Sequence, residues 1–375
     1  MQYDLVFEGG GAKGAVFVGA LREFAARGHT ARRFLGTSAG AITATIMAAG
    51  YDSAEMFEAV NEKLADGKPR FSTFMDIPAQ FELADIQNSL TYAIFKKVDL
   101  PWVPNMAEGW VDERIFEQLV QVDAYREIFS FVERGGLYAG DAFLQWMREK
   151  LNARNRNLGS TTLSEFHAKT GSDLSLVASD TTDQQMLIFN HRTAPDCPVA
   201  WAVRMSMSIP FVWQEVRWEP AWGQYRGADI SGHTIVDGGV LSNFPIHLLT
   251  SKDAEVVAIM GDTDPDAVPN LGFLIDETLP VAGAGEAEKA QGTEDLAGGL
   301  LNNAKRLKIV QRIEKLVDTM TTAHDKEAIK AHEKEVCRLP AKGYGTTEFD
   351  MSDQRLQALI AAGQTAMKEY FERPA

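Results

Sequence analysis

A serine at position 38 stands between two glycines in the stretch Gly36-Thr37-Ser38-Ala39-Gly40. The spacing Gly-x-Ser-x-Gly is typical of a nucleophile elbow, in which a serine hydroxyl is exposed on a sharp turn from a strand into a helix. An apolar run precedes Ser38 and a run of small residues follows it, as that turn requires. The alternative is an ordinary turn in which Ser38 only caps the helix. Ser38 is therefore a candidate nucleophile, with Gly36 and Gly40 allowing the tight turn.

A second glycine-dense turn follows the first apolar run of the chain. Its Gly-x-Gly-x-x-Gly spacing occurs in dinucleotide-binding loops, but such sites also need an acidic residue after the second strand, and the run 32–38 has none. A loop of this kind can instead direct several backbone N–H groups at one point and so form an oxyanion hole. The dinucleotide-binding enzyme stays open as an alternative. The motif glycines are Gly9 and Gly14, and the expected oxyanion hole comprises Gly10, Gly11, Ala12 and Lys13.

A nucleophilic serine needs a general base, and the chain offers histidines and a carboxylate for that role. Of the seven histidines, we interpret His233 and His247 as structural or surface residues, since neither has distinctive surroundings. Asp237 ends a predicted strand and precedes Gly238 and Gly239. We therefore expect it at the carboxyl edge of the sheet. Taken alone, it would be interpreted as a turn or cap residue.

Together these motifs resemble those of the patatin-like phospholipase family. The order is Gly-Gly-Gly-Ala-Lys-Gly at 9–14, Gly-Thr-Ser-Ala-Gly at 36–40 and Asp-Gly-Gly at 237–239. Three further blocks are similar to the family: RMSMSIPFVW, VLSNFP and, near the end of the chain, GYGTTEFDMS. Lys13 stands where many members carry arginine, which keeps the charge but loses the planar fork. The motifs cover residues 3–262 well, whereas the insertion and most of the last hundred residues match only loosely.

The resemblance implies a serine acyl hydrolase that cleaves ester bonds of phospholipids or other lipids through an acyl-enzyme. The dyad would be Ser38 and Asp237, without a catalytic histidine, a metal or another cofactor. An aspartate with the ordinary pKa of ~3.9 matches a serine hydroxyl poorly, so burial beside apolar neighbours must raise it. A non-catalytic relative that binds lipid or a protein partner is the remaining alternative. Whether the protein has a protein activator or forms homo-oligomers is left open.

The elements that must position these residues follow from the first fifty residues. Two successive strand–turn–helix patterns predict a parallel sheet, so that both glycine turns lie at the edge where α/β sheets bind ligands. The expected class is a three-layer α/β/α fold with a mainly parallel central sheet. We expect a catalytic domain at 1–262 with a helical insertion at about 52–137, and a helical extension at 263–375 on the same globule. Within the catalytic domain, 255–262 is expected as a buried strand.

Composition narrows the classes of function. The 375 residues are 45% hydrophobic and 24% charged, as in ordinary globular proteins. A net charge of −15 argues against nucleic-acid binding. The chain has two cysteines, Cys197 and Cys337, which lie far apart in the sequence. This argues against a disulfide framework and against a metal site built from cysteines. The start does not resemble a signal peptide, so we expect a cytoplasmic protein with peripheral membrane contact; export without a cleaved signal stays open.

Three stretches are candidates for contact with a membrane surface that carries the phospholipid or other acyl-ester substrate. Tryptophan and aliphatic side chains suit the boundary between water and lipid. They are Trp102, Val103, Met106 and Trp110 in the first stretch and Leu271, Phe273, Leu274 and Ile275 in the second. An amphipathic helix at 300–320 adds basic residues from Lys305 to Lys315. In each case the alternative is that these residues pack on the core.

Overall fold

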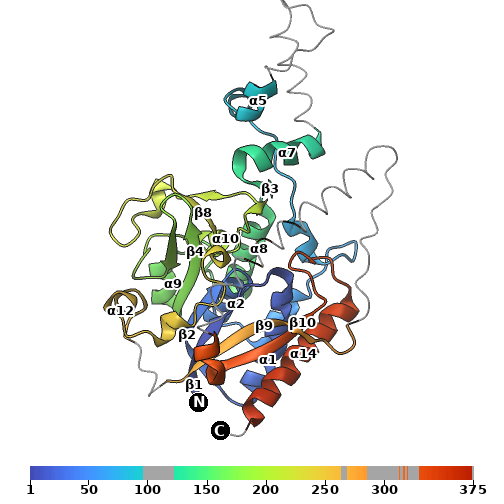
Figure 1. Cartoon of the computed structure of the whole chain (residues 1–375), viewed down its shortest axis with the longest axis vertical. Helices are drawn as coiled ribbons and strands as arrows, with labels where there is room; N and C mark the ends of the chain where they lie inside the picture. Colours follow the sequence, from blue (N-terminus) through green and yellow to red (C-terminus); the bar gives the residue numbers. More distant parts are fainter. Residues whose placement is uncertain are drawn as a thin grey trace, which may run out of the picture.

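A central sheet with helices on both faces forms the body of the molecule (Figure 1). The computed structural model describes residues 1–95, 122–262, 268–284 and 329–373, together with residues 312, 316 and 319. The strands are β1 (Gln2–Phe7), β2 (Thr30–Thr37), β3 (Gly136–Tyr138), β4 (Asp173–Asp180), β5 (Gln185–Phe189), β6 (Phe211–Trp213), β7 (Val216–Arg217), β8 (Thr234–Asp237), β9 (Asn270–Pro280) and β10 (Val336–Lys342). The α-helices are α1 (Val16–Ala26), α2 (Ala39–Ala48), α3 (Ser53–Val60), α4 (Leu83–Gln87), α5 (Leu90–Phe95), α7 (Asp123–Arg134), α8 (Asp141–Asn152), α9 (Leu163–Thr170), α10 (Val199–Ser206), α11 (His247–Thr250), α12 (Ala254–Met260) and α14 (Asp353–Glu372).

The main sheet has the strand order β10-β9-β1-β2-β4-β8-β7, and β5 also pairs with β4. The five strands from β10 to β4 are parallel to one another. The strands β5 and β8 run antiparallel to β4, and β7 runs antiparallel to β8. The expected α/β class with a mainly parallel central sheet is therefore confirmed.

Alternating side chains of the central strands pack on the two opposite faces of the sheet. In β1, Leu5 and Phe7 pack into the core that includes α1, α2 and α14, whereas Val6 packs with Leu248 and Met260 from α11 and α12. A strand buried on both faces reads as a continuous apolar run, which is why the sequence marks β1 so clearly. The sheet is thus covered on both sides.

Residues after 262 contribute strands as well as helix, which differs from the expected helical extension. β9 pairs with β1 and β10 pairs with β9, so both complete the parallel part of the sheet. α14 is a helix as the sequence predicts, and the Ser352 side chain caps its first turn. The glycine- and proline-rich surroundings of β9 conceal a strand whose partner, β1, lies more than two hundred residues earlier.

Most of the stretch 255–262 belongs to the helix α12 (Ala254–Met260), and the expectation of a buried strand there is wrong. Its β-branched residues favour strands in general. However, Val256, Ile259 and Met260 recur at positions i, i+3 and i+4, which is one face of a helix, and they pack together on the sheet. The Asp253 side chain accepts a hydrogen bond from the Glu255 N–H at 2.8 Å and caps the helix.

The second candidate for membrane contact is part of the core, so that expectation is wrong. The exposed fractions are 0% for Leu271 and Phe273, 5% for Leu274 and 8% for Ile275, because these residues form the middle of β9. Trp102, Trp110 and the basic residues from Lys305 to Lys315, apart from Arg312, lie outside the described residues. Among the described helices, none is both long and apolar enough to cross a bilayer.

The helices α1 and α14 lie against each other with their backbones in contact (Figure 1). A Cβ atom on Gly19 of α1 would lie 1.7 Å from the carbonyl oxygen of Ile360. A Cβ atom on Gly363 of α14 would lie 2.1 Å from the carbonyl oxygen of Val16. Both glycines are therefore required by close approach of the helices, which presses α14 onto the same core as the first strand.

We predict that Gly19→Ala and Gly363→Ala each lower the midpoint of thermal unfolding. The added methyl group meets backbone atoms that cannot move alone, and overpacking of this kind typically costs about 1–3 kcal/mol. Differential scanning calorimetry measures the effect, with Gln357→Ala on the exposed face of α14 as the control. A midpoint for either glycine variant equal to that of the control would contradict the close approach of the helices.

Candidate active site

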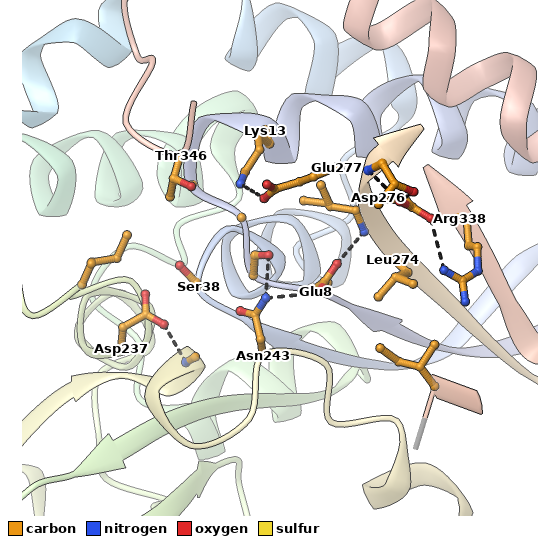
Figure 2. A pocket seen from close by; sticks show the side chains of 18 of the residues that line it. Glu8, Lys13, Ser38, Asp237, Asn243, Leu274, Asp276, Glu277, Arg338 and Thr346 are labelled. Atoms are coloured by element: carbon orange, nitrogen blue, oxygen red, sulfur yellow. Dashed lines mark hydrogen bonds and ion pairs between the residues drawn. The ribbon is translucent and has the colours of Figure 1, made fainter. Parts of the chain in front are cut away.

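Two glycine turns and the end of one antiparallel strand meet at a cavity of about 530 Å³ (Figure 2). Most of the candidate residues contribute to its wall. The lining includes Gly9, Gly10, Gly11, Lys13, Ser38, Asp237 and Gly239. Motifs that are separated by two hundred residues in the chain thus come together at one place.

Ser38 lies on the turn between β2 and α2. Its backbone angles, φ 53° and ψ −119°, are ones that residues other than glycine rarely adopt. A Cβ atom on Gly36 would lie 2.2 Å from the carbonyl oxygen of Gly40, and one on Gly40 would lie 2.2 Å from that of Phe7. The flanking glycines are therefore needed for contacts within the turn and with β1. Such strained residues persist only where the surroundings hold them, and they cluster at functional sites.

The carboxylate of Asp237 is buried, and its two oxygens differ in their hydrogen bonding. Its Oδ1 accepts a hydrogen bond from the Gly239 N–H at 2.7 Å, whereas Oδ2 has no hydrogen-bond partner among the described residues. Burial raises the pKa of Asp237 from 3.8 to about 7, and the nearby Ser38 hydroxyl and the Gly239 amide oppose this rise only in part. The carboxylate can therefore take up a proton near neutral pH, next to the serine.

The route by which Asp237 reaches Ser38 differs from the expected one. β8 is not a parallel strand that ends at the carboxyl edge of the sheet, because it runs antiparallel to β4. It starts beyond that edge and ends where Asp237 pairs with Ala178, one residue from the Val177 that pairs with Thr37. Asp237 thus arrives beside the serine from the opposite direction.

The glycine loop offers fewer free amides than the sequence predicts. The Ala12 N–H donates to the carbonyl oxygen of Thr346 at 2.8 Å, and the Lys13 N–H donates to that of Gly10 at 3.2 Å. Within the described part of the chain, no hydrogen bond occupies the amide of Gly10 or Gly11. Gly11 has φ +54°, and a Cβ atom there would lie 2.1 Å from the Thr346 oxygen. Of the four residues expected to form an oxyanion hole, Gly10 and Gly11 are therefore those whose amides have no partner among the described residues.

Several charged side chains in this cavity pair with residues of its own wall. Lys13 forms an ion pair with Glu277, and Arg338 forms one with Asp276 at 3.1 Å. Glu8 accepts hydrogen bonds from the Ile275 N–H at 2.5 Å and from the Asn243 side chain at 3.3 Å (Figure 2). The wall away from Ser38 therefore carries charges of both signs among its apolar side chains.

A second cavity, of about 60 Å³, also reaches Ser38 but has an apolar wall. Its aliphatic and aromatic side chains come from α1, α2, α3, α8, the segment between α3 and α8, β6 and the segment between β10 and α14. They include Val18, Ile42, Ile46, Met56, Phe71, Phe74, Phe143, Trp146, Trp213 and Phe349. Ser38, Gly11 and Ile209 line both cavities. The serine thus stands between a larger cavity that carries charged side chains and a smaller one whose wall is apolar.

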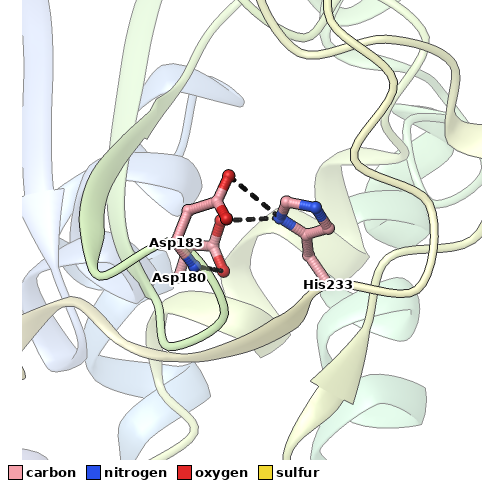
Figure 3. A group of neighbouring side chains, drawn as sticks. All are labelled: Asp180, Asp183 and His233. Carbon is pink, nitrogen blue, oxygen red and sulfur yellow. Dashed lines mark hydrogen bonds and ion pairs between the residues drawn. The ribbon is translucent and has the colours of Figure 1, made fainter.

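The two histidines considered as bases lie elsewhere. His233 Nδ1 is 2.8 Å from Asp180 Oδ2, and this carboxylate raises the pKa of the imidazole (Figure 3). Asp183 completes a group with donor types suited to a metal, yet Asp180 also accepts backbone hydrogen bonds at 2.9 and 3.3 Å. Neither His233 nor His247 lines either cavity at Ser38. Their interpretation as structural or surface residues agrees with these positions.

Three residues at the site were not singled out from the sequence. Ser206 accepts a hydrogen bond from the Ser38 N–H at 3.0 Å, Asn243 donates to the Gly9 carbonyl oxygen at 3.1 Å, and Thr346 accepts from Ala12. Each lies in one of the three further blocks that resemble the family. The blocks were a sufficient signal for the segments, but not for the individual side chains.

We predict that Asp237→Asn stabilises the fold in a pH-dependent way. Asp237 binds its proton more tightly in the folded chain, so its contribution to the free energy of unfolding falls as pH rises from about 4 to about 7. The amide never ionises, so the variant should unfold at a higher temperature than the wild type at about pH 8 and near the wild-type temperature at about pH 4.5. Calorimetry at both pH values checks this, and an equal difference at both would contradict a raised pKa.

Comparisons with known proteins agree with this site. The chain is 28% identical over 371 residues to the uncharacterized protein YqhO of Bacillus subtilis (strain 168), covering 97% of this chain and 96% of that one. It is 21% identical over 244 residues to the probable lipid hydrolase 463L of Invertebrate iridescent virus 6, covering 65% of this chain and 62% of the relative.

The solved structures that match this chain are of longer chains. VipD from Legionella pneumophila matches with a TM-score of 0.45 and 17% identity, covering 99% of this chain and 66% of its own. The type III effector protein ExoU matches with a TM-score of 0.40 and 15% identity, covering 99% of this chain and 53% of its own. The model of the family named patatin-like phospholipase matches residues 5–250, a range that contains both glycine turns and Asp237. The chain therefore belongs to the patatin-like phospholipase family.

Proposed function

We propose that the protein is a serine acyl hydrolase that cleaves ester bonds of phospholipids or other lipids with Ser38 as nucleophile and Asp237 as base. The observation that carries the proposal is the buried carboxylate of Asp237, with a pKa of about 7 and an unused Oδ2, beside a serine on a strained turn. A general base works best when its pKa lies near the operating pH. Desolvation thus supplies the match that an ordinary aspartate lacks.

The proposed reaction runs in two halves that use the same groups. Asp237 takes the Ser38 proton as Oγ attacks the ester carbonyl carbon, while the amides of Gly10 and Gly11 bind the oxyanion. Collapse of the tetrahedral intermediate breaks the bond to the alcohol, which leaves with the proton from Asp237. Water then attacks the acyl-enzyme, Asp237 accepts its proton, and collapse returns that proton to Ser38 and releases the fatty acid.

The two cavities at Ser38 support a lipid ester as the substrate. The apolar cavity offers aromatic and aliphatic contacts to an acyl chain, and the larger cavity, which carries charged side chains, offers space to the leaving alcohol with its head group. An ester whose carbonyl lies over Ser38 would place its two halves in surroundings of matching polarity. Because such lipids lie in bilayers, we propose that the protein acts at a membrane surface.

Covalent labelling tests the nucleophile. We expect a fluorophosphonate probe to add once to the protein, at Ser38, and Ser38→Ala to abolish both labelling and hydrolysis of p-nitrophenyl esters. Intact-mass and peptide mass spectrometry locate the adduct. Labelling of a different serine in the wild type would overturn the assignment of Ser38.

The same assay examines the base. Asp237→Asn keeps the shape but cannot accept the proton, so kcat should fall by a factor on the order of 10² to 10⁴. In the wild type, kcat/KM should rise with pH around a midpoint near 7, where Asp237 loses its proton. His233→Asn serves as the matched control and should keep most of the activity. A loss in the histidine variant with the fold intact would favour a triad.

Acyl-chain length tests the apolar cavity. Phe74 is buried in its wall against Trp146 and Phe143. Phe74→Ala removes the ring and lengthens the space, so the ratio of kcat/KM for a dodecanoyl ester to that for a butyryl ester should rise about tenfold or more. Phe166→Ala, a buried phenylalanine of α9 outside this cavity, should leave the ratio unchanged. An unchanged ratio in Phe74→Ala would mean that the acyl chain lies elsewhere.

A further inference from the structure

A three-residue segment at the end of α10, residues 206–208, contacts the backbone of both members of the proposed dyad. The Ser206 Oγ accepts a hydrogen bond from the Ser38 N–H at 3.0 Å. The carbonyl oxygen of Ser208 accepts one from the Asp237 N–H at 2.9 Å. The 206–208 segment therefore joins nucleophile and base through main-chain contacts, without touching the proton that passes between them.

The direction of the bond to Ser38 is set by a second contact. The Ser206 hydroxyl donates to the carbonyl oxygen of Val177 at 2.6 Å. A hydroxyl has one hydrogen to donate, so a lone pair remains for the Ser38 N–H. Val177 belongs to β4 and pairs with Thr37, the residue before the serine. Ser206 thus ties the turn to the strand beside it, inside a fully buried site.

Ser38 needs such a tie because its backbone is strained. A residue other than glycine at φ 53° is retained only when its surroundings define it by several contacts. Its N–H is buried at the start of α2, where a helix supplies no internal partner. The Ser206 hydroxyl accepts a hydrogen bond from this N–H, so it gives the buried amide a partner and fixes the direction in which the N–H points.

The 206–208 segment is itself anchored by a buried arginine. The Arg204 guanidinium donates to the Ser208 hydroxyl, which in turn donates to the Arg204 carbonyl oxygen at 2.5 Å. The same guanidinium donates to the carbonyl oxygens of Ala139 at 2.7 Å and Gln214 at 3.1 Å. These bonds hold the segment against the residues that follow β3 and β6.

We propose that Ser206 is a positioning residue, which keeps Ser38 in the conformation that aims its Oγ at the substrate and at Asp237. This inference rests on the proposed function of the dyad and adds a residue to it. Without the hydroxyl, Ser38 would relax toward an unstrained backbone and move its Oγ away from the line between base and substrate.

The experiment compares Ser206→Ala with the wild type in the p-nitrophenyl ester and fluorophosphonate assays. Misplacement of a reacting group by about 1 Å can cost on the order of 100-fold in rate. We expect kcat and the labelling rate to fall by about 10-fold to 100-fold, while KM stays within about twofold. The midpoint of the pH profile should not change, because the surroundings of Asp237 Oδ2 are intact.

Two further variants separate positioning from stability. Ser89 is also a buried serine that accepts a backbone N–H, from Tyr92 at 3.0 Å, and donates to a backbone oxygen, that of Ile86 at 2.7 Å, but lies outside both cavities. Ser89→Ala should lower the unfolding temperature comparably and leave kcat unchanged. Ser206→Thr keeps the hydroxyl and should recover most of the rate.

Each result decides between outcomes. A labelling rate for Ser206→Ala within about twofold of the wild type, or an equal loss in Ser89→Ala, would overturn the role of Ser206 and leave the proposed function standing. Absence of labelling in the wild type would instead overturn the proposed function. If circular dichroism shows Ser206→Ala to be unfolded, Ser206→Cys takes its place with the same expected split between kcat and KM, because a thiol keeps the volume but is a weak hydrogen-bond partner.

Discussion

Close contact between backbones at the turn after β2 is the constraint on which the site depends. Gly40 leaves no room for a side chain against Phe7, and Gly36 leaves none against Gly40, so β1, β2 and α2 meet without intervening atoms. This contact places the strained Ser38 beside the glycine loop that follows β1, at the carboxyl edge of the sheet. Each loop follows the carboxyl end of its strand, and β1 and β2 are parallel neighbours. The candidate nucleophile and the amides of Gly10 and Gly11 therefore lie at the same edge of the sheet.

Burial of Asp237 is the second requirement, and the sheet supplies it. The carboxylate lies at the junction of β8 and β4, and among the described residues the Gly239 amide donates a hydrogen bond to its Oδ1. Additional hydrogen-bond donors would lower the pKa of Asp237 and make it less suited to the proposed role as a base. The cost in folding free energy of keeping a carboxyl group with one unpaired oxygen is therefore part of the chemistry, and the extensive core offsets it.

Local patterns predicted the site better than they predicted the sheet. Ser38 and the glycine turns are readable because each motif determines its own turn within five or six residues. Ser206, Thr346 and the use of the Ala12 amide could not be read, since each depends on a partner more than one hundred and fifty residues away. β9 was missed because its apolar run is short and its strand partner distant. For 255–262, β-branched residues outweighed a helical spacing too brief to recognise.

The position of β1 in the sheet has a consequence for how the protein matures. β1 lies between β2, which follows it directly, and β9, which is made more than two hundred residues later. Until β9 joins, β1 is an edge strand with unpaired backbone groups, which is an aggregation hazard during synthesis. Until residue 346 has been made, the glycine loop also lacks the hydrogen bond from the Ala12 amide to the Thr346 carbonyl oxygen. A growing chain therefore carries the turn with the candidate nucleophile early but completes the wall around it only after β9 and the segment with Thr346 have been added, so that synthesis itself delays assembly of the site.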